Sequence, residues 1–89
     1  MKAVVTVVGH DAKGIIAKVS GYLLEKGANV EDISQTILGE YFAMIMIVDI
    51  SAVNEELSVL AKECAELGKQ IGMSIYMQHE DIFNAMHNV

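Results

Sequence analysis

The sequence has no proline, tryptophan or arginine, and it has a single cysteine, Cys64. One cysteine cannot form an intramolecular disulfide, and no Cys-x-x-Cys pair is present to bind zinc or to perform redox chemistry. Without arginine the chain lacks the planar, bidentate donor that strong phosphate sites use. These absences argue against disulfide-supported folding, thiol chemistry, a heavy-metal carrier and an acylphosphatase-like hydrolase.

Basic residues and long hydrophobic runs are also scarce. Six lysines stand against twelve acidic residues, which gives a formal net charge of -6. Nucleic-acid-binding proteins normally carry a basic surface, and Glu40 precedes Tyr41-Phe42 where an RNA-recognition motif has Lys or Arg. The uncharged run 41–48 is too short to span a membrane, and 3–8 is too short for a secretory leader. We therefore expect a cytoplasmic protein with neither a nucleic-acid nor a membrane partner.

The apolar content is high for so short a chain. Hydrophobic residues make up 53% of the 89 residues, enough for a single domain spanning residues 1–89. A chain of this length buries only ~60–65% of its unfolded surface when it folds alone. We therefore expect self-association as a homodimer or a higher homo-oligomer.

Hydrophobic periodicity predicts the order of the elements. Residues 2–8 are β-branched and apolar, period-two patterns follow from Asn29 and over 41–50, and Gly39-Glu40 turns the chain between them. Apolar residues at helical spacing predict a helix over 12–26, capped by Asp11, and another that opens after Asn54 and ends at Gly72. A strand over 73–78 follows, and then a helical tail over 80–89, whose apolar stripe is Ile82, Phe83, Met86 and Val89.

This order predicts an α+β, ferredoxin-like βαββαβ fold. Right-handed crossovers place both long helices on one face of a four-stranded antiparallel sheet, with strands 2–8 and 41–50 in the middle. Residues 41–50 are apolar on both alternating faces, although the two helices can cover only one. The other face is therefore expected to be covered by the tail, by a second subunit, or by both.

The segment Gly9-His10-Asp11-Ala12-Lys13-Gly14-Ile15 is the most informative loop. The first turn of the following helix has unpaired N–H groups that would suit a carboxylate. Alternatively, Asp11 only caps that helix and Gly14 only permits close packing. The three histidines lack the spacing of a helical metal pair, and Cys64 falls on an apolar helical stripe, so neither a metal nor a cofactor is expected.

The chain resembles the ACT domain family. The resemblance rests on an aliphatic first strand, the loop Asp11-Ala12-Lys13-Gly14-Ile15, a helix ending Glu25-Lys26-Gly27, and the entry Ala28-Asn29-Val30 to the next strand. It implies an amino-acid niche, usually at a subunit interface, with Asn29 bonding the backbone of the ligand, Asp11 as the loop acid, and main-chain donors at Gly14 and Ile15. We expect the niche residues to converge at the start of the first helix; they are His10, Asp11, Gly14, Ile15 and Asn29.

The resulting hypothesis is a non-catalytic regulatory protein. It would bind an amino acid or a similar small metabolite, act as a homo-oligomer, and regulate a separate protein. The alternative is a structural or protein–protein interaction module with a vestigial niche. No nucleophile–base pair or metal constellation is visible, so an enzyme is not expected.

Overall fold

The computed structural model describes residues 1–10 and 14–87, without the side chain of residue 87. The element order confirms the predicted β-α-β-β-α-β pattern with an added C-terminal helix. The elements are β1 (Lys2–Gly9), α1 (Ile15–Glu25), β2 (Asn29–Leu38), β3 (Tyr41–Asp49), α2 (Leu57–Ile71), β4 (Ser74–His79) and α3 (Glu80–His87).

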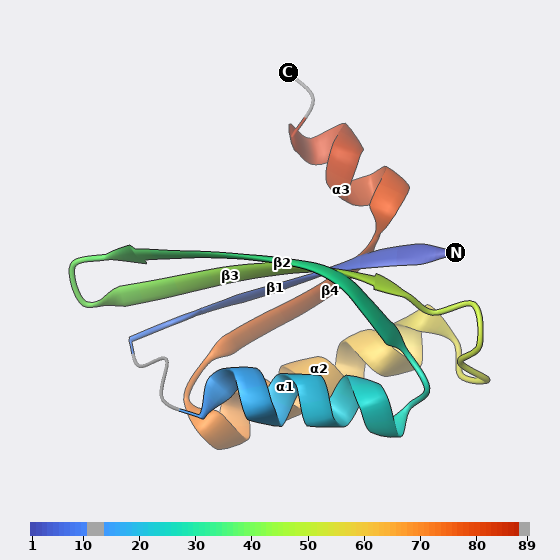
Figure 1. The fold of residues 1–89 in the computed structure, drawn as a ribbon, viewed down its shortest axis with the longest axis horizontal. Coiled ribbons are helices and arrows are strands. Elements are labelled where there is room, and N and C mark those ends of the chain that lie inside the picture. Colours follow the sequence, from blue (N-terminus) through green and yellow to red (C-terminus); the bar gives the residue numbers. More distant parts are fainter. Residues whose placement is uncertain (11–13, 88–89) are drawn as a thin grey trace.

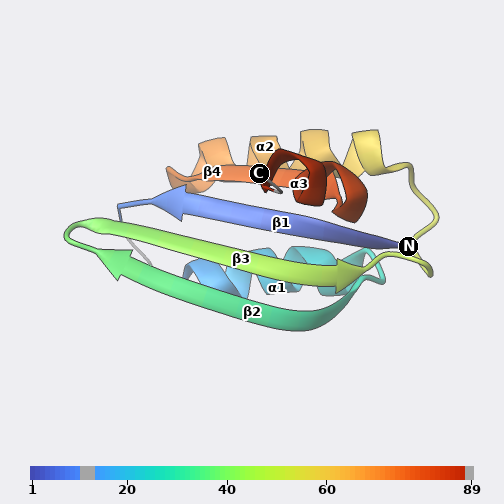
Figure 2. The same cartoon turned by 90° about the horizontal axis from the view of Figure 1, so that it is seen from above.

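The four strands form one antiparallel sheet in the order β2-β3-β1-β4, so β1 and β3 are central as predicted. Helices α1 and α2 cover one face of this sheet, and α3 stands on the other (Figure 1). Seen from above, α3 lies over β4 and leaves β3 and β2 uncovered (Figure 2). None of the described helices is long and apolar enough to cross a membrane.

The core lies between the sheet and the helices α1 and α2. Alternate residues of β3 point into it, as its period-two pattern predicts, whereas β1 is buried at the three consecutive positions 3–5, as expected for an apolar central strand. Cys64 of α2 is fully buried there, and burial raises the pKa of its thiol to about 11, so the thiol is inert near neutral pH. The fully buried side chains of the core include Val5, Val7, Val19, Leu23, Met44, Met46, Val48 and Leu60.

Both long helices begin later than predicted. Helix α1 begins at Ile15, because Gly14 occupies the N-cap position with a left-handed φ of 74° that a helix interior does not allow. Asp11, predicted to be the cap, lies outside the described residues. Helix α2 begins at Leu57 with an extended Glu56 at its N-cap, so the prediction that Asn54 opens the helix is wrong. Gly72 ends α2 in a left-handed conformation, as predicted.

Strand β2 departs from the predicted strict alternation near its start. Val30 pairs with Val48 whereas Asp32 pairs with Ile47, so Glu31 is an extra residue in a bulge. The bulge turns Val30 toward the core instead of leaving it on the face of Asp32. Glu31 instead forms an ion pair of 2.9 Å with Lys2 of β1.

A polar cluster joins the two long helices on their outer side. The Tyr22 hydroxyl donates to Glu63 Oε1 at 2.8 Å, and Lys26 Nζ lies 3.2 Å from the same oxygen and 2.7 Å from Glu55 Oε1. The hydrogen bonds from Tyr22 and Lys26 lower the pKa of Glu63. Burial and the bond to Glu63 raise the pKa of Tyr22. Glu63 therefore joins α1 to α2.

Candidate functional site

The predicted loop leaves the sheet at the end where the β2–β3 hairpin turns. Gly9, the last residue of β1, pairs with Phe42, and Leu38 pairs with Tyr41 across the hairpin. A Cβ atom at Gly9 would overlap the Sδ atom of Met73, so the Met73 side chain packs directly on the Gly9 backbone and would have to move for a larger residue. The next residue, His10, therefore lies beside the hairpin turn.

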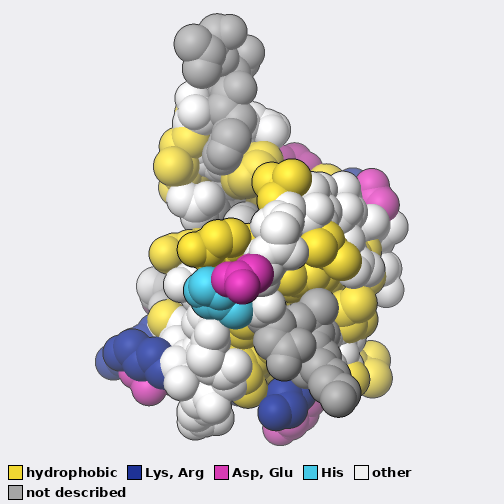
Figure 3. All heavy atoms as spheres, turned by 90° about the vertical axis from the view of Figure 1, so that its left-hand side faces the viewer, with side chains coloured by type: hydrophobic (Ala, Val, Ile, Leu, Met, Phe, Trp, Pro, Cys, Tyr) yellow, Lys and Arg dark blue, Asp and Glu magenta, His cyan; other side chains and the backbone are white. Residues whose placement is uncertain are grey.

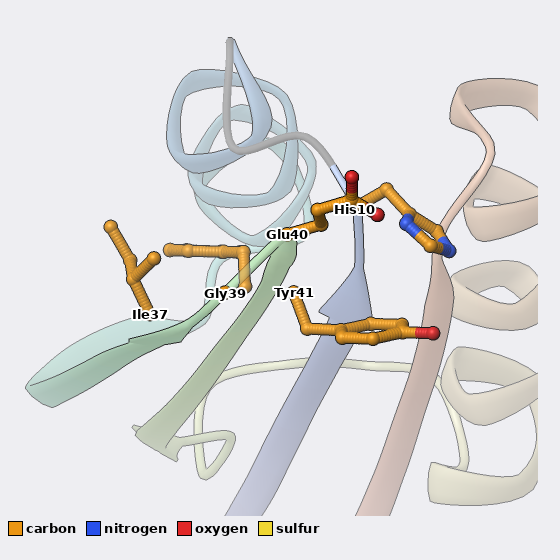
Figure 4. A pocket seen from close by; sticks show the side chains of 6 residues that line it. His10, Ile37, Gly39, Glu40 and Tyr41 are labelled. Atoms are coloured by element: carbon orange, nitrogen blue, oxygen red, sulfur yellow. The ribbon is translucent and has the colours of Figure 1, made fainter.

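An open pocket of about 430 Å³ lies at this end of the sheet. The imidazole of His10 packs on the ring of Tyr41, with ring centroids 4.5 Å apart and an interplanar angle of 42°. The side chain of Glu40 points toward His10 (Figure 4). Figure 3 looks onto this end and shows a histidine beside an acidic side chain, with hydrophobic side chains next to them. The pocket is lined by His10, Ile37, Gly39, Glu40, Tyr41 and Phe42.

The N-terminus of α1 starts from the same end of the molecule (Figure 1). Gly14 has no side chain with which to cap the helix, and the first turn contains no acidic residue. The first N–H groups of a helix have no intrahelical acceptor and carry partial positive charge. Ile15 is buried in the core, so it can contribute only its backbone N–H. This helix end is suited to a carboxylate group.

The two features have complementary electrostatics. The carboxylate of Glu40 suits a cationic group, the imidazole and phenol of His10 and Tyr41 offer hydrogen bonds and ring faces, and the start of α1 suits an anion. A zwitterion presents both charges over a few ångströms. The described residues contain no group of three or more His, Cys, Asp or Glu side chains arranged to hold a metal ion.

Asn29 lies at the opposite end of the sheet. It pairs with Asp49, which in turn pairs with Lys2 at the start of β1. Helix α1 separates Asn29 from Gly14, and its 11 residues span ~16 Å. The expectation that Asn29 converges with the loop within one chain is therefore wrong.

The structure thus brings only part of the predicted niche together. His10 lines the pocket, Gly14 and Ile15 form the start of α1 without lining it, and Asp11 is not described. The sequence interpretation missed Glu40 and Tyr41. The antiparallel topology was the available signal, because it places the turn after β2 at the same end of the sheet as the end of β1.

Comparison with known proteins identifies the family. The family model described as ACT domain matches residues 2–78. The chain belongs to the ACT domain family. An "ACT domain protein from Streptococcus pneumoniae" is 43% identical, covers 93% of this chain and 93% of its own, and superposes with a TM-score of 0.84.

Two further relatives bear on the role of this ACT chain. A UPF0237 protein from Methanopyrus kandleri is 47% identical over 88 residues, which are 99% of this chain and 98% of the relative. The regulatory subunit of aspartate kinase from Thermus thermophilus, in its ligand-free form, is 25% identical with a TM-score of 0.56; the match covers 86% of this chain and 50% of that chain. The family and its neighbours support a regulatory role.

Proposed function

We propose that this ACT protein is a non-catalytic regulator that binds an amino acid or a similar small metabolite and acts as a homo-oligomer. The observation that carries the proposal is that the α1 N-terminus, where Gly14 offers no side-chain cap, starts from the same end of the molecule as the His10–Glu40–Tyr41 pocket (Figure 1). The ligand carboxylate would bind the N–H groups that follow Gly14, and its ammonium group would face Glu40.

Asn29 enters this proposal only as a residue of a second copy. Its amide can both donate to and accept from the main-chain groups of an amino acid. Within one chain it is a helix length away from Gly14. A niche shared between two copies would make ligand binding depend on assembly of the homo-oligomer.

The regulated target would be a separate protein. The Thermus relative is a regulatory subunit of aspartate kinase, and the present chain matches 50% of it. For the present chain, the ligand would change the surface that a partner recognises.

Thermal shift against the twenty amino acids tests the ligand. A ligand at 100 times its Kd adds ~2.7 kcal/mol to the native state, which should raise the Tm of a chain this small by roughly 10 °C or more. Glu40→Gln should weaken binding of the active ligand by about tenfold or more, since a charged hydrogen-bond acceptor is lost. Glu66→Gln is the matched control, because Glu66 lies on the exposed side of α2 and pairs only loosely with Lys69, at 3.6 Å.

The alternative function is a structural or interaction module with a vestigial niche. It is favoured by the distance of Asn29 from the loop and by the burial of Ile15. No Tm shift with any of the amino acids or common metabolites, in a protein that still self-associates, would support this alternative and contradict ligand sensing.

A further inference from the structure

The sheet face opposite α1 and α2 is only partly covered. Residues paired across neighbouring strands point to the same side, so the register identifies the residues on this face. We call this surface the free face and define it by the rows Thr36–Ala43–Val8–Ser74 and Ser34–Ile45–Thr6–Tyr76. Helix α3 stands over its β4 side, and β2 and β3 remain open (Figure 2).

Helix α3 carries apolar side chains that its own sheet leaves exposed. It contacts β1 and β4, and a groove of about 380 Å³ remains between Phe83 and Met86 of α3 and Ile45 of β3. Ile82 does not line this groove and is 56% exposed, while Met86 is 61% exposed. The apolar stripe of α3 therefore has a second side that its own chain does not cover.

The charge pattern favours a second copy as the occupant of this surface. The two central rows that define the free face contain no charged residue, although the chain carries a net charge of -6. On the same side of the sheet, Asp32 lies in the next row and the pair Asp49–Lys2 lies beyond it. Two acidic chains repel each other over most of their surfaces. Over the two central rows and the apolar side of α3 they can meet without opposing like charges, while Ile45, Tyr76, Ile82 and Met86 are removed from water.

The area is of the order that a specific interface needs. Four strands at ~4.8 Å spacing and eight residues at ~3.3 Å give ~500 Å² in projection for this whole side of the sheet, part of which lies under α3. Specific interfaces bury at least ~1,000 Å² in total, or ~500 Å² per partner. The exposed sides of α3, with Ile82 and Met86, replace the area that this helix covers.

We propose that two copies join through the free face, and that Ile82 of each α3 packs on Ile45 of the other copy. The contact is isologous, so each chain gives and receives the same contact, and the two α3 helices fill the space between the sheets. This inference specifies the surface used by the homo-oligomer of the proposed function and does not depend on ligand binding.

Charge complementation tests the proposal on the full chain. Ile82→Glu and Ile45→Lys each place a charge in the dimer contact and should each weaken dimerisation by at least ~10-fold in sedimentation velocity. Ile45 is 38% exposed, so neither change enters the core of the single chain. Mixed in equal amounts, the two variants should recover a dimer, because the introduced lysine then faces the introduced glutamate while the reciprocal Ile82–Ile45 contact stays native.

The controls separate this contact from a general effect of charge. Leu24 on the outer side of α1 is 77% exposed, so Leu24→Glu and Leu24→Lys should leave dimerisation unchanged. Native mass spectrometry distinguishes the mixed dimer from either homodimer by mass. Circular dichroism confirms that each variant is folded.

Three outcomes overturn the inference, and they differ in what they say about the proposed function. A parent chain that remains monomeric at the highest concentration it tolerates would refute both the interface and the homo-oligomer. A dimer that neither Ile82→Glu nor Ile45→Lys weakens would refute this interface and leave the homo-oligomer standing. A monomer stabilised by a small apolar molecule in the groove would make that groove a ligand site. Whichever of these outcomes is found, the thermal-shift assay against the twenty amino acids tests ligand binding independently.

Discussion

Replacing Gly68 with alanine should destabilise the chain, although the same change in a helix usually stabilises. Gly68 is buried in α2 where this helix meets β4. A Cβ atom there would lie 2.5 Å from the carbonyl oxygen of Met73 and 3.2 Å from the backbone N of Ile75. These neighbours are backbone atoms, so α2 or β4 must move. The movement also strains the hydrogen bond of 2.8 Å from Met73 N–H to the Gly68 carbonyl.

The magnitude follows from two opposing effects. Alanine gains ~0.5–1 kcal/mol over glycine inside a helix, and overpacking a well-filled site costs ~1–3 kcal/mol. With backbone on the opposing side we expect the upper part of that cost, so Gly68→Ala should lose ~1–2 kcal/mol. Gly21 in α1 is the matched control, because nothing lies within 4 Å of its Cβ position. Gly21→Ala should therefore gain ~0.5–1 kcal/mol.

Thermal denaturation followed by circular dichroism measures both changes. All proteins must be compared at one concentration, because self-association adds to apparent stability. The Tm values should move in opposite directions, by roughly 4–8 °C for each kcal/mol in a chain of this size. A Gly68→Ala variant as stable as Gly21→Ala would refute the argument that close approach of backbone to backbone fixes the α2–β4 packing.

The remaining predictions concern the helix cluster and the helix α3. The Tyr22 and Lys26 hydrogen bonds lower the pKa of Glu63, so its contribution to stability is present above its unfolded value of 4.5 and is lost as the pH falls through the folded pKa. Glu63→Gln should thus be less stable than the parent at pH 7, and the two stabilities should converge as the pH falls through the lowered pKa of Glu63. His79 Nδ1 accepts the Asp81 N–H at 3.0 Å, so His79→Ala should speed amide exchange in α3 while His79→Asn preserves protection. Equal exchange in both His79 variants would contradict a capping role.

Much of the fold could be predicted because its signals are local. The apolar run of β1, the alternation in β3 and the glycine stop at Gly72 are read from neighbouring residues, and the structure confirms them. The start of α1 could not be predicted from the apolar pattern, since it depends on the left-handed conformation of Gly14. The bulge at Glu31 depends on the pairing of β2 with β3, and no residue pattern within β2 indicates it.

The candidate site was harder to predict than the fold. The family resemblance led to His10 and Gly14, which the structure places at one end of the molecule. It also grouped Asn29 with them, although a helix of 11 residues keeps these positions apart in one chain. Short motifs indicate which residues take part in a site. The distances between those residues depend on the directions of the helices and strands and on whether a second chain is present.

The geometry of the free face relates the site to the proposed dimer. Asn29 pairs with Asp49 on the free-face side of the sheet, and Tyr41 lies on the same side at the opposite end. A two-fold axis perpendicular to the strands reverses their direction, so it carries Asn29 of one copy toward the His10–Tyr41 end of the other. Tyr41 and Ile45 also share one side of β3, four residues or ~13 Å apart, so a ligand packed on Tyr41 lies on the same side of the sheet as the Ile45 contact. If the ligand binds the dimer more tightly than the monomer, linkage requires that it strengthen dimerisation by the corresponding factor.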